Sequence, residues 1–136
     1  MKKQLTILIA DDNDLMREAL NMVLSLWDNV KLVREARNGE EAILLAVEIL
    51  PDIILMDINM SPVNGFEATE KILTLNSKIK IIGLSVNRQA SYARNMVLLG
   101  ARGYLIKTSS YKEIIIAIET VIEGDIYIDK TIEGII

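Results

Sequence analysis

Residues 53–65 read IILMDINMSPVNG, and this stretch decides the fold. Its first four residues are all apolar, which predicts a short strand buried on both faces, as in the middle of a parallel sheet. Asp57 ends the run, and a turn-rich segment from Asn59 to Gly65 follows it. A carboxylate at the end of a buried strand is costly when it has no partner. Asp57 is therefore the first candidate for a functional residue.

Apolar runs of strand length alternate with helix-like segments on both sides of this stretch. Strands are predicted at residues 5–10, 31–35, 53–56, 79–84 and 103–106. Helices are predicted at residues 14–27, between Gly39 and Pro51, at 66–75, at 88–99 and at 110–123, with Asp14 and Ser110 as N-caps. Five strand–helix pairs indicate an α/β fold, a flavodoxin-like (βα)5 doubly wound parallel sheet with strand order 2-1-3-4-5. The residues after Gly124 fit no sixth pair.

The composition excludes several kinds of chemistry. The chain has 136 residues, which suits one domain, and it contains no cysteine and no histidine. Disulfides, thiolate sites and histidine-based catalysis are therefore excluded. The net charge of −4 argues against broad nucleic-acid binding. The apolar run near the N-terminus stops at Asp11, too early for a signal peptide, and no stretch could span a bilayer, so we expect a cytoplasmic protein without a membrane contact.

Five polar residues stand at the ends of four predicted strands: Asp11 and Asp12, Asp57, Ser85, and Lys107. Ligands bind at these carboxyl ends in doubly wound sheets. Clustered carboxylates repel one another unless a cation neutralises them, and Mg²⁺ prefers such oxygen ligands. Asp57 would then be both a metal ligand and a weak oxygen nucleophile for a phosphoryl group. The Lys107 ammonium and the Ser85 hydroxyl would stabilise charge on the phosphoryl oxygens.

This ordered set resembles the bacterial response-regulator receiver family across about residues 5–123. The matching motifs are the Asp11-Asp12 pair, DINM with a later glycine (57–65), GLS (83–85) and GYLIK (103–107). The resemblance implies that a histidine kinase or a phosphotransfer protein donates a phosphoryl group to Asp57. It also implies that Mg²⁺ is bound by Asp11, Asp12, Asp57 and the backbone carbonyl of Asn59. Ser85 and Tyr104 would be the switch residues, and Lys107 would bind the phosphate. Asn59 and Asn87 would tune the lifetime of the phosphorylated state.

Two positions depart from the family's usual pattern. Ser61 follows Met60 where the family commonly has proline, and Pro62 comes one residue later. The family's lysine is often followed by a cis proline, whereas Thr108 follows Lys107 here. A cis bond before a residue other than proline costs about 3 kcal/mol. The sequence therefore leaves the geometry of the Lys107–Thr108 bond open.

Details near the end of the chain, ARGYLIK (101–107) without proline and the GDIY tail (124–127), resemble receivers that precede a LuxR-type helix-turn-helix. We therefore predict a receiver domain at residues 1–124 and, at residues 125–136, a C-terminal tail or the start of a linker to an output domain. Phosphorylation would switch the surface of helix 4, strand 5 and helix 5 and so control an output, with transcription as the first candidate. That surface is also a candidate homodimer interface. DNA would be bound only through the output domain, and the chain would not be an enzyme acting on an external substrate.

Other interpretations stay open beside this one. The Asp11-Asp12 pair could cap a helix, Lys107 could be a solvated surface residue, and the isoleucine-rich last helix could be packed rather than a partner surface. Haloacid-dehalogenase-type phosphatases use similar groups around Mg²⁺, but their nucleophile comes first in a D-x-D motif, and here Asn59 stands two residues after Asp57. None of the seven glycines falls in a nucleotide-binding pattern. A pseudo-receiver, which keeps the fold without phosphorylation, is a third alternative.

Overall fold

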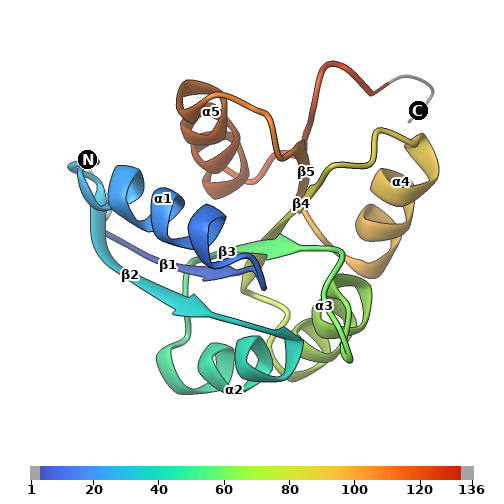
Figure 1. The fold of residues 1–136 in the computed structure, drawn as a ribbon, viewed down its shortest axis with the longest axis horizontal. Helices are drawn as coiled ribbons and strands as arrows, with labels where there is room; N and C mark the ends of the chain where they lie inside the picture. Colours follow the sequence, from blue (N-terminus) through green and yellow to red (C-terminus); the bar gives the residue numbers. More distant parts are fainter. Residues whose placement is uncertain (1–3, 133–136) are drawn as a thin grey trace.

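A parallel β-sheet forms the middle layer of the protein, and helices cover both of its faces (Figure 1). The computed structural model describes residues 4–132. The strands run in the order β2-β1-β3-β4-β5-β6, and every adjacent pair is parallel. The strands are β1 (Leu5–Ala10), β2 (Val30–Ala36), β3 (Ile53–Asp57), β4 (Lys80–Ser85), β5 (Gly103–Ile106) and β6 (Tyr127–Ile128). The helices are α1 (Asp14–Ser25), α2 (Gly39–Ile49), α3 (Gly65–Leu75), α4 (Ala90–Leu99) and α5 (Tyr111–Ile122).

Two hydrophobic clusters pack on opposite faces of the sheet. One contains side chains of α2, α3 and α4, and the other contains side chains of α1 and α5. In β3, Ile54 and Met56 belong to the first cluster, whereas Ile53 and Leu55 belong to the second. Successive strand residues point to opposite faces, so a strand covered on both sides is apolar at every position. This arrangement confirms the doubly wound α/β fold and the order 2-1-3-4-5 for the five predicted strands.

The tail after α5 adds a sixth strand that the sequence did not predict. The N–H of Tyr127 donates to the carbonyl of Arg102 at 3.0 Å, and the N–H of Asp129 donates to the carbonyl of Tyr104 at 2.9 Å. β6 therefore lies on the outer side of β5, parallel to it. β6 has only two residues, which is too short an apolar run to predict a strand. In the described part of the tail, β6 pairs with β5, and Asp129 and Ile132 are buried. The division into a receiver domain and a tail or linker stays a prediction.

One predicted helix cap is correct and one is wrong. Ser110 caps α5, because its side chain accepts a hydrogen bond from the N–H of Glu113 at 3.1 Å. Asp14 does not cap α1; the cap is Asn13, whose side chain accepts from the N–H of Met16 at 3.0 Å. Asparagine and aspartate are both good cap residues. Here Asp14 lies in the first turn of the helix and pairs with Arg17 instead.

The wide apolar face of α5 is used mainly for packing. Ile114, Ile118 and Val121 are buried in the cluster shared with α1. Ile115 and Ile122 are half-buried against the same cluster. Ile116 is the exception, with 43% of its surface exposed. The helix therefore serves the core of its own domain, and Ile116 is the isoleucine of α5 that reaches most into solvent.

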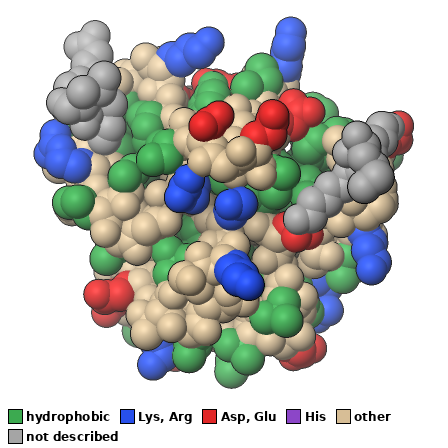
Figure 2. Space-filling model, turned by 180° about the vertical axis from the view of Figure 1, so that it is seen from behind, with side chains coloured by type: hydrophobic (Ala, Val, Ile, Leu, Met, Phe, Trp, Pro, Cys, Tyr) green, Lys and Arg blue, Asp and Glu red, His purple; other side chains and the backbone are tan. Residues whose placement is uncertain are grey.

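Two further sequence-based questions are answered within residues 4–132. The one cis peptide bond there is Ser61–Pro62, so the Lys107–Thr108 bond is trans. No helix of this part of the chain is long and apolar enough to cross a membrane. On the face turned away from the viewer in Figure 1, acidic, basic and hydrophobic side chains are interspersed (Figure 2).

Candidate functional site

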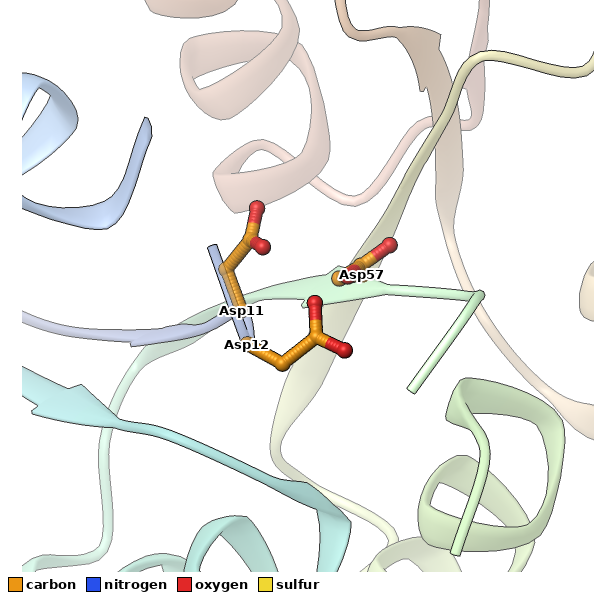
Figure 3. Close-up of side chains that lie close together, drawn as sticks. All are labelled: Asp11, Asp12 and Asp57. Carbon is orange, nitrogen blue, oxygen red and sulfur yellow. The ribbon is translucent and has the colours of Figure 1, made fainter. Parts of the chain in front are cut away.

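The predicted site residues meet at the carboxyl ends of the central strands. Asp11 and Asp12 follow β1, and Asp57 is the last residue of β3. The carboxylates of these three residues converge there (Figure 3), with oxygens that all lie within 4.8 Å of one another. Ser85 ends β4, and Lys107 follows β5 directly. Parallel topology thus brings together residues that are up to 96 positions apart in the chain, from Asp11 to Lys107.

The three carboxylates differ in their surroundings. Asp11 and Asp57 are buried, at 0% and 1% exposed, whereas Asp12 is exposed. Oδ1 of Asp11 accepts from the N–H of Asn13 at 2.9 Å, and Oδ1 of Asp57 accepts from the N–H of Asn59 at 3.1 Å. Oδ2 of Asp57 is buried and has no hydrogen-bond partner among the described residues. A buried carboxylate oxygen without a partner is unfavourable unless a cation or a ligand binds there.

Lys107 lies between the two buried aspartates. Its Nζ is 3.1 Å from Oδ2 of Asp11 and 3.3 Å from Oδ1 of Asp57. Burial alone would lower the pKa of Lys107, but the hydrogen bond to Asp11 and the charges of Asp57 and Asp11 raise it above its usual value. The side chain is therefore a fixed ammonium group that faces Asp57, and it is not a solvated surface lysine.

The acidity of Asp57 reflects its crowded position. Burial raises its pKa to about 6, and the nearby charge of Asp11 acts in the same direction. Lys107 and the N–H of Asn59 oppose this shift without cancelling it. Without a metal ion, the two buried carboxylates carry more negative charge than the one ammonium group neutralises. This is the setting in which oxygen ligands favour a divalent metal ion.

Ser85, Asn87 and Tyr104 form a connected group beside the carboxylates. The Ser85 hydroxyl accepts from the N–H of Asn87 at 3.0 Å and donates to the side-chain oxygen of Asn59 at 3.3 Å. The Tyr104 ring is fully buried, and its hydroxyl donates to the carbonyl of Asn87 at 2.7 Å. Burial also raises the pKa of this hydroxyl, so it stays a donor. A movement of Ser85 towards Asp57 would therefore act on Asn87 and through it on Tyr104.

Arg17 is a site-supporting residue that sequence reasoning missed. It is buried, and its Nη1 donates to the backbone carbonyl of Asp11 at 2.8 Å. Its Nε donates to Glu35 and its Nη2 to Asp14, each at 2.8 Å. The guanidinium group thus ties the end of β1, where Asp11 stands, to β2 and α1. The only sequence signal was an arginine one helical turn after Asp14, which suits an ordinary surface pair equally well.

We expect Arg17→Met to lower the free energy of unfolding by about 2–3 kcal/mol. The variant leaves the buried carbonyl of Asp11 without its side-chain donor, and the Glu35 carboxylate keeps only the donor from Asn21. Urea unfolding followed by circular dichroism measures the change. Arg37→Met is the matched control, since this side chain is 71% exposed and its nearest contact to Glu41 is 3.7 Å. The control is expected to cost less than about 0.5 kcal/mol. Equal losses in the two variants would contradict the anchoring role of Arg17.

Comparison with known proteins gives a consistent result over nearly the whole chain. The family model described as "Response regulator receiver domain" matches residues 7–119. Transcriptional regulatory protein DegU of Brevibacillus brevis is 35% identical over 127 residues, which cover 93% of this chain and 54% of that protein. Response regulator GacA of Pseudomonas protegens is 35% identical over 126 residues, which cover 93% of this chain and 59% of that protein.

A similar solved structure agrees with the family model. The crystal structure of a two-component response regulator of the LuxR family from Aurantimonas sp. SI85-9A1 matches with a TM-score of 0.90 and 28% identity. The match covers 96% of this chain and 93% of that chain. By contrast, the chain spans between half and two thirds of the length of the curated relatives DegU and GacA. The relatives' full-length activities therefore concern more sequence than this chain contains.

Proposed function

The chain belongs to the response regulator receiver family of two-component systems, and from this premise we propose that it accepts a phosphoryl group on Asp57 from a histidine kinase or a phosphotransfer protein. The observation that carries the proposal is the buried, unpartnered Oδ2 of Asp57 beside the Lys107 ammonium. A carboxylate oxygen in this position has a free lone pair and a neighbouring cation that can bind the incoming phosphoryl oxygens.

In the proposed transfer, a carboxylate oxygen of Asp57 attacks the phosphorus of phosphohistidine in line. The new P–O bond forms as the P–N bond breaks, and the electron pair of that bond goes to the imidazole nitrogen. Lys107 is 3.3 Å from Asp57 and binds a phosphoryl oxygen as charge builds up on it. Hydrolysis reverses the modification: water attacks the phosphorus, inorganic phosphate leaves, and the Asp57 carboxylate is restored. No external substrate is turned over, so the chain acts as a switch and not as an enzyme.

The residues at the site fit a magnesium ion. Asp11, Asp12, Asp57 and the backbone carbonyl of Asn59 would hold it. The carboxylate oxygens within 4.8 Å of one another and the unpartnered Oδ2 of Asp57 support this assignment. When bound, Mg²⁺ neutralises the excess carboxylate charge and stabilises the negative charge of the phosphoryl group.

Ser85 and Tyr104 are the proposed switch residues. The phosphoryl group would draw the Ser85 hydroxyl away from Asn59, and the shared partner Asn87 would pass the change to Tyr104. Tyr104 already points inward in this structure, so the switch would stabilise this arrangement over others rather than create it. By the family resemblance, Asn59 and Asn87 would tune how long the phosphoryl group survives.

The proposed output is control of transcription, through a separate DNA-binding domain. The relative DegU is a transcriptional regulatory protein, which supports transcription as the output. The surface of α4, β5 and α5 would change with phosphorylation. β6 is hydrogen-bonded to the outer side of β5, so a homodimer through this surface would meet α4, α5 and β6 rather than a bare β5. A cytoplasmic location, where a kinase could reach Asp57, is part of the same proposal.

Intact-mass spectrometry after incubation with acetyl phosphate tests the proposed function. In Mg²⁺ we expect one adduct of about 80 Da, and in EDTA we expect none, because the metal is needed to neutralise the site. Borohydride reduction, which converts aspartyl phosphate to homoserine, should place the modification at Asp57 in the peptide map. An adduct elsewhere, or no adduct together with no Mg²⁺-dependent binding of beryllofluoride, would contradict the proposal and favour a pseudo-receiver.

A further inference from the structure

Asp129 is a buried carboxylate in the tail after β6, and none of the roles above uses it. The residue is 4% exposed. Its Oδ1 accepts from the N–H and the hydroxyl of Thr131, at 2.9 and 2.6 Å. Its Oδ2 accepts from the hydroxyl of Ser109 at 3.0 Å and from the N–H of Ile106 at 3.3 Å. One oxygen therefore binds the tail itself, while the other binds the segment between β5 and α5.

That segment carries Lys107. Ile106 stands directly before the lysine and Ser109 stands two residues after it. Asp129 therefore binds the chain on both sides of Lys107, through the N–H of Ile106 and the hydroxyl of Ser109. The ammonium group of Lys107 in turn faces Asp57 at 3.3 Å. The position of this ammonium group thus depends on a carboxylate that arrives from the far end of the chain.

Asp129 is ionised in this setting. Burial would raise its pKa, but the hydrogen bonds from Thr131, Ile106 and Ser109 hold it below the usual value. A buried carboxylate that relies on neutral donors is costly to keep unless those donors stay in place. Thr131 alone could satisfy Oδ1 if Asp129 only closed a turn in the tail. The contacts of Oδ2 are the ones that a simple turn does not require.

The tail also reaches the segment that carries the other switch contacts. The Thr131 hydroxyl accepts from Nε of Arg88 at 3.3 Å, and Arg88 follows Asn87, the partner of Tyr104. The N–H of Asp129 donates to the carbonyl of Tyr104 at 2.9 Å. Ile132, 6% exposed, anchors the end of the described tail in the cluster under α2, α3 and α4. The docked tail therefore contacts the segment after β4, which carries Asn87, and the segment after β5, which carries Lys107. A phosphoryl group on Asp57 would act on both segments.

We propose that Asp129 is a positioning residue for Lys107 and that it links docking of the tail to phosphorylation of Asp57. The inference rests on the proposed function. In the docked arrangement the Lys107 ammonium faces Asp57. A phosphoryl group adds negative charge at that position, so a fixed ammonium stabilises the phosphorylated state more than the unmodified one, and docking favours phosphorylation. Linkage is reciprocal, so a phosphoryl group on Asp57 strengthens docking of the tail to the same extent. The tail therefore reports whether Asp57 is phosphorylated.

The test uses beryllofluoride, a stable stand-in for the phosphoryl group, with the 136-residue chain. Its affinity is measured by calorimetry in Mg²⁺ for the wild type, for Asp129→Asn and for the matched control Asp125→Asn, an exposed aspartate of the same tail. Asp129→Asn replaces one acceptor oxygen by a donor and breaks the clamp. We expect about fivefold weaker beryllofluoride binding in this variant and less than about twofold change in the control.

Two further measurements separate positioning from a general loss of structure. Mg²⁺ affinity without beryllofluoride should stay within about twofold of the wild type in Asp129→Asn, because the carboxylates of the acid cluster are untouched. In the wild type, hydrogen exchange of the Tyr127 and Asp129 amides should slow by about fivefold when beryllofluoride binds. Ser109→Ala removes one of the two contacts of Oδ2 and leaves the tail sequence unchanged, so it serves if Asp129→Asn folds poorly. It should weaken beryllofluoride binding in the same direction.

The outcomes distinguish the inference from the function on which it rests. Wild-type binding of beryllofluoride with unchanged affinity in Asp129→Asn and Ser109→Ala would overturn the linkage and leave the proposed function standing. Equal losses of Mg²⁺ and beryllofluoride affinity would show a structural role only and would also overturn it. A wild-type chain that binds no beryllofluoride would overturn both the proposed function and the inference.

Discussion

Asp57→Asn is expected to abolish phosphoryl acceptance and, in the same protein, to raise the free energy of unfolding in the absence of metal. Asparagine offers no carboxylate oxygen to attack phosphorus, so the adduct of about 80 Da should disappear completely. It also removes a buried negative charge that lies beside Asp11. The stability of the metal-free variant should exceed that of the wild type by about 1–3 kcal/mol at pH 7. Function and stability therefore move in opposite directions at this position.

The pH dependence of the wild type follows from the same shift. The pKa of Asp57 is about 6 in the folded protein, against an ordinary value of 3.8. Between these values the folded state binds more protons than the unfolded state, so this group makes stability fall as pH rises from about 4 to about 6. Below that window the carboxyl is protonated in both states, and its destabilising effect is absent. Asp57→Asn should lack this part of the pH profile.

Urea unfolding in EDTA at pH 4, 5, 6 and 7 measures the effect on stability. Asp125→Asn, an exposed aspartate, is the matched control and should leave both the pH profile and the phosphoryl adduct unchanged. Added Mg²⁺ should stabilise the wild type more than Asp57→Asn, because the variant has lost one ligand. An Asp57→Asn protein less stable than the wild type at pH 7 would show that the buried Asp57 carboxylate does not destabilise the metal-free fold.

Gly65→Ala is expected to be the most destabilising single-methyl change near the site. A Cβ at this position would lie 2.3 Å from the carbonyl oxygen of Asp57 and 2.6 Å from Cα of Ile58. Both atoms belong to the backbone of the acceptor strand and its turn, so neither can swing away. The N–H of Gly65 also donates to the carbonyl of Ile58 at 2.9 Å, which fixes the approach. We expect a loss of about 3 kcal/mol or more, with a slower acetyl phosphate reaction because Asp57 must shift.

Gly124→Ala provides the comparison for this prediction. Gly124 has a φ of 102°, but a Cβ there would meet nothing within 4 Å. The cost should therefore be limited to backbone strain, about 1–2 kcal/mol, and the rate of phosphorylation should be unchanged. Chemical unfolding and the acetyl phosphate assay measure both effects. A Gly65→Ala protein as stable as Gly124→Ala would mean that the turn after Asp57 adapts more freely than its close contacts suggest.

The sequence predicted the parts of the protein that depend on regular patterns. A strand covered on both faces is apolar throughout, so residues 53–56 could be recognised as a strand, and Asp57 as the acid that follows it. Parallel topology then brings every strand end to one edge. For this reason Asp11, Ser85 and Lys107 could be placed together without knowledge of any contact. The geometry found there matches the predicted set, although the chemical roles of these residues are still proposals.

The features that the sequence did not predict correctly have a different cause. Asn13 and Asp14 are equally suitable as helix caps. Which of them caps α1 depends on Arg17, because Arg17 forms an ion pair with Asp14. The role of Arg17 itself depends on the distance to the carbonyl of Asp11, which no local pattern reveals. The same holds for Asp129, whose four hydrogen bonds come from residues in two different segments. Contacts between distant residues, rather than periodicity, decide such cases.

β6 has a consequence for aggregation as well as for signalling. A strand at the margin of a sheet exposes unpaired backbone groups, which can recruit a strand from another molecule. β5 is buried along its whole length, and three of its four residues are large and hydrophobic. As an uncovered edge strand it would favour aggregation. β6 occupies that position with only two residues, and exposed Asp125 and Lys130 stand on either side of it. A chain that ended at Gly124 would lose this cover and would be prone to self-association through β5.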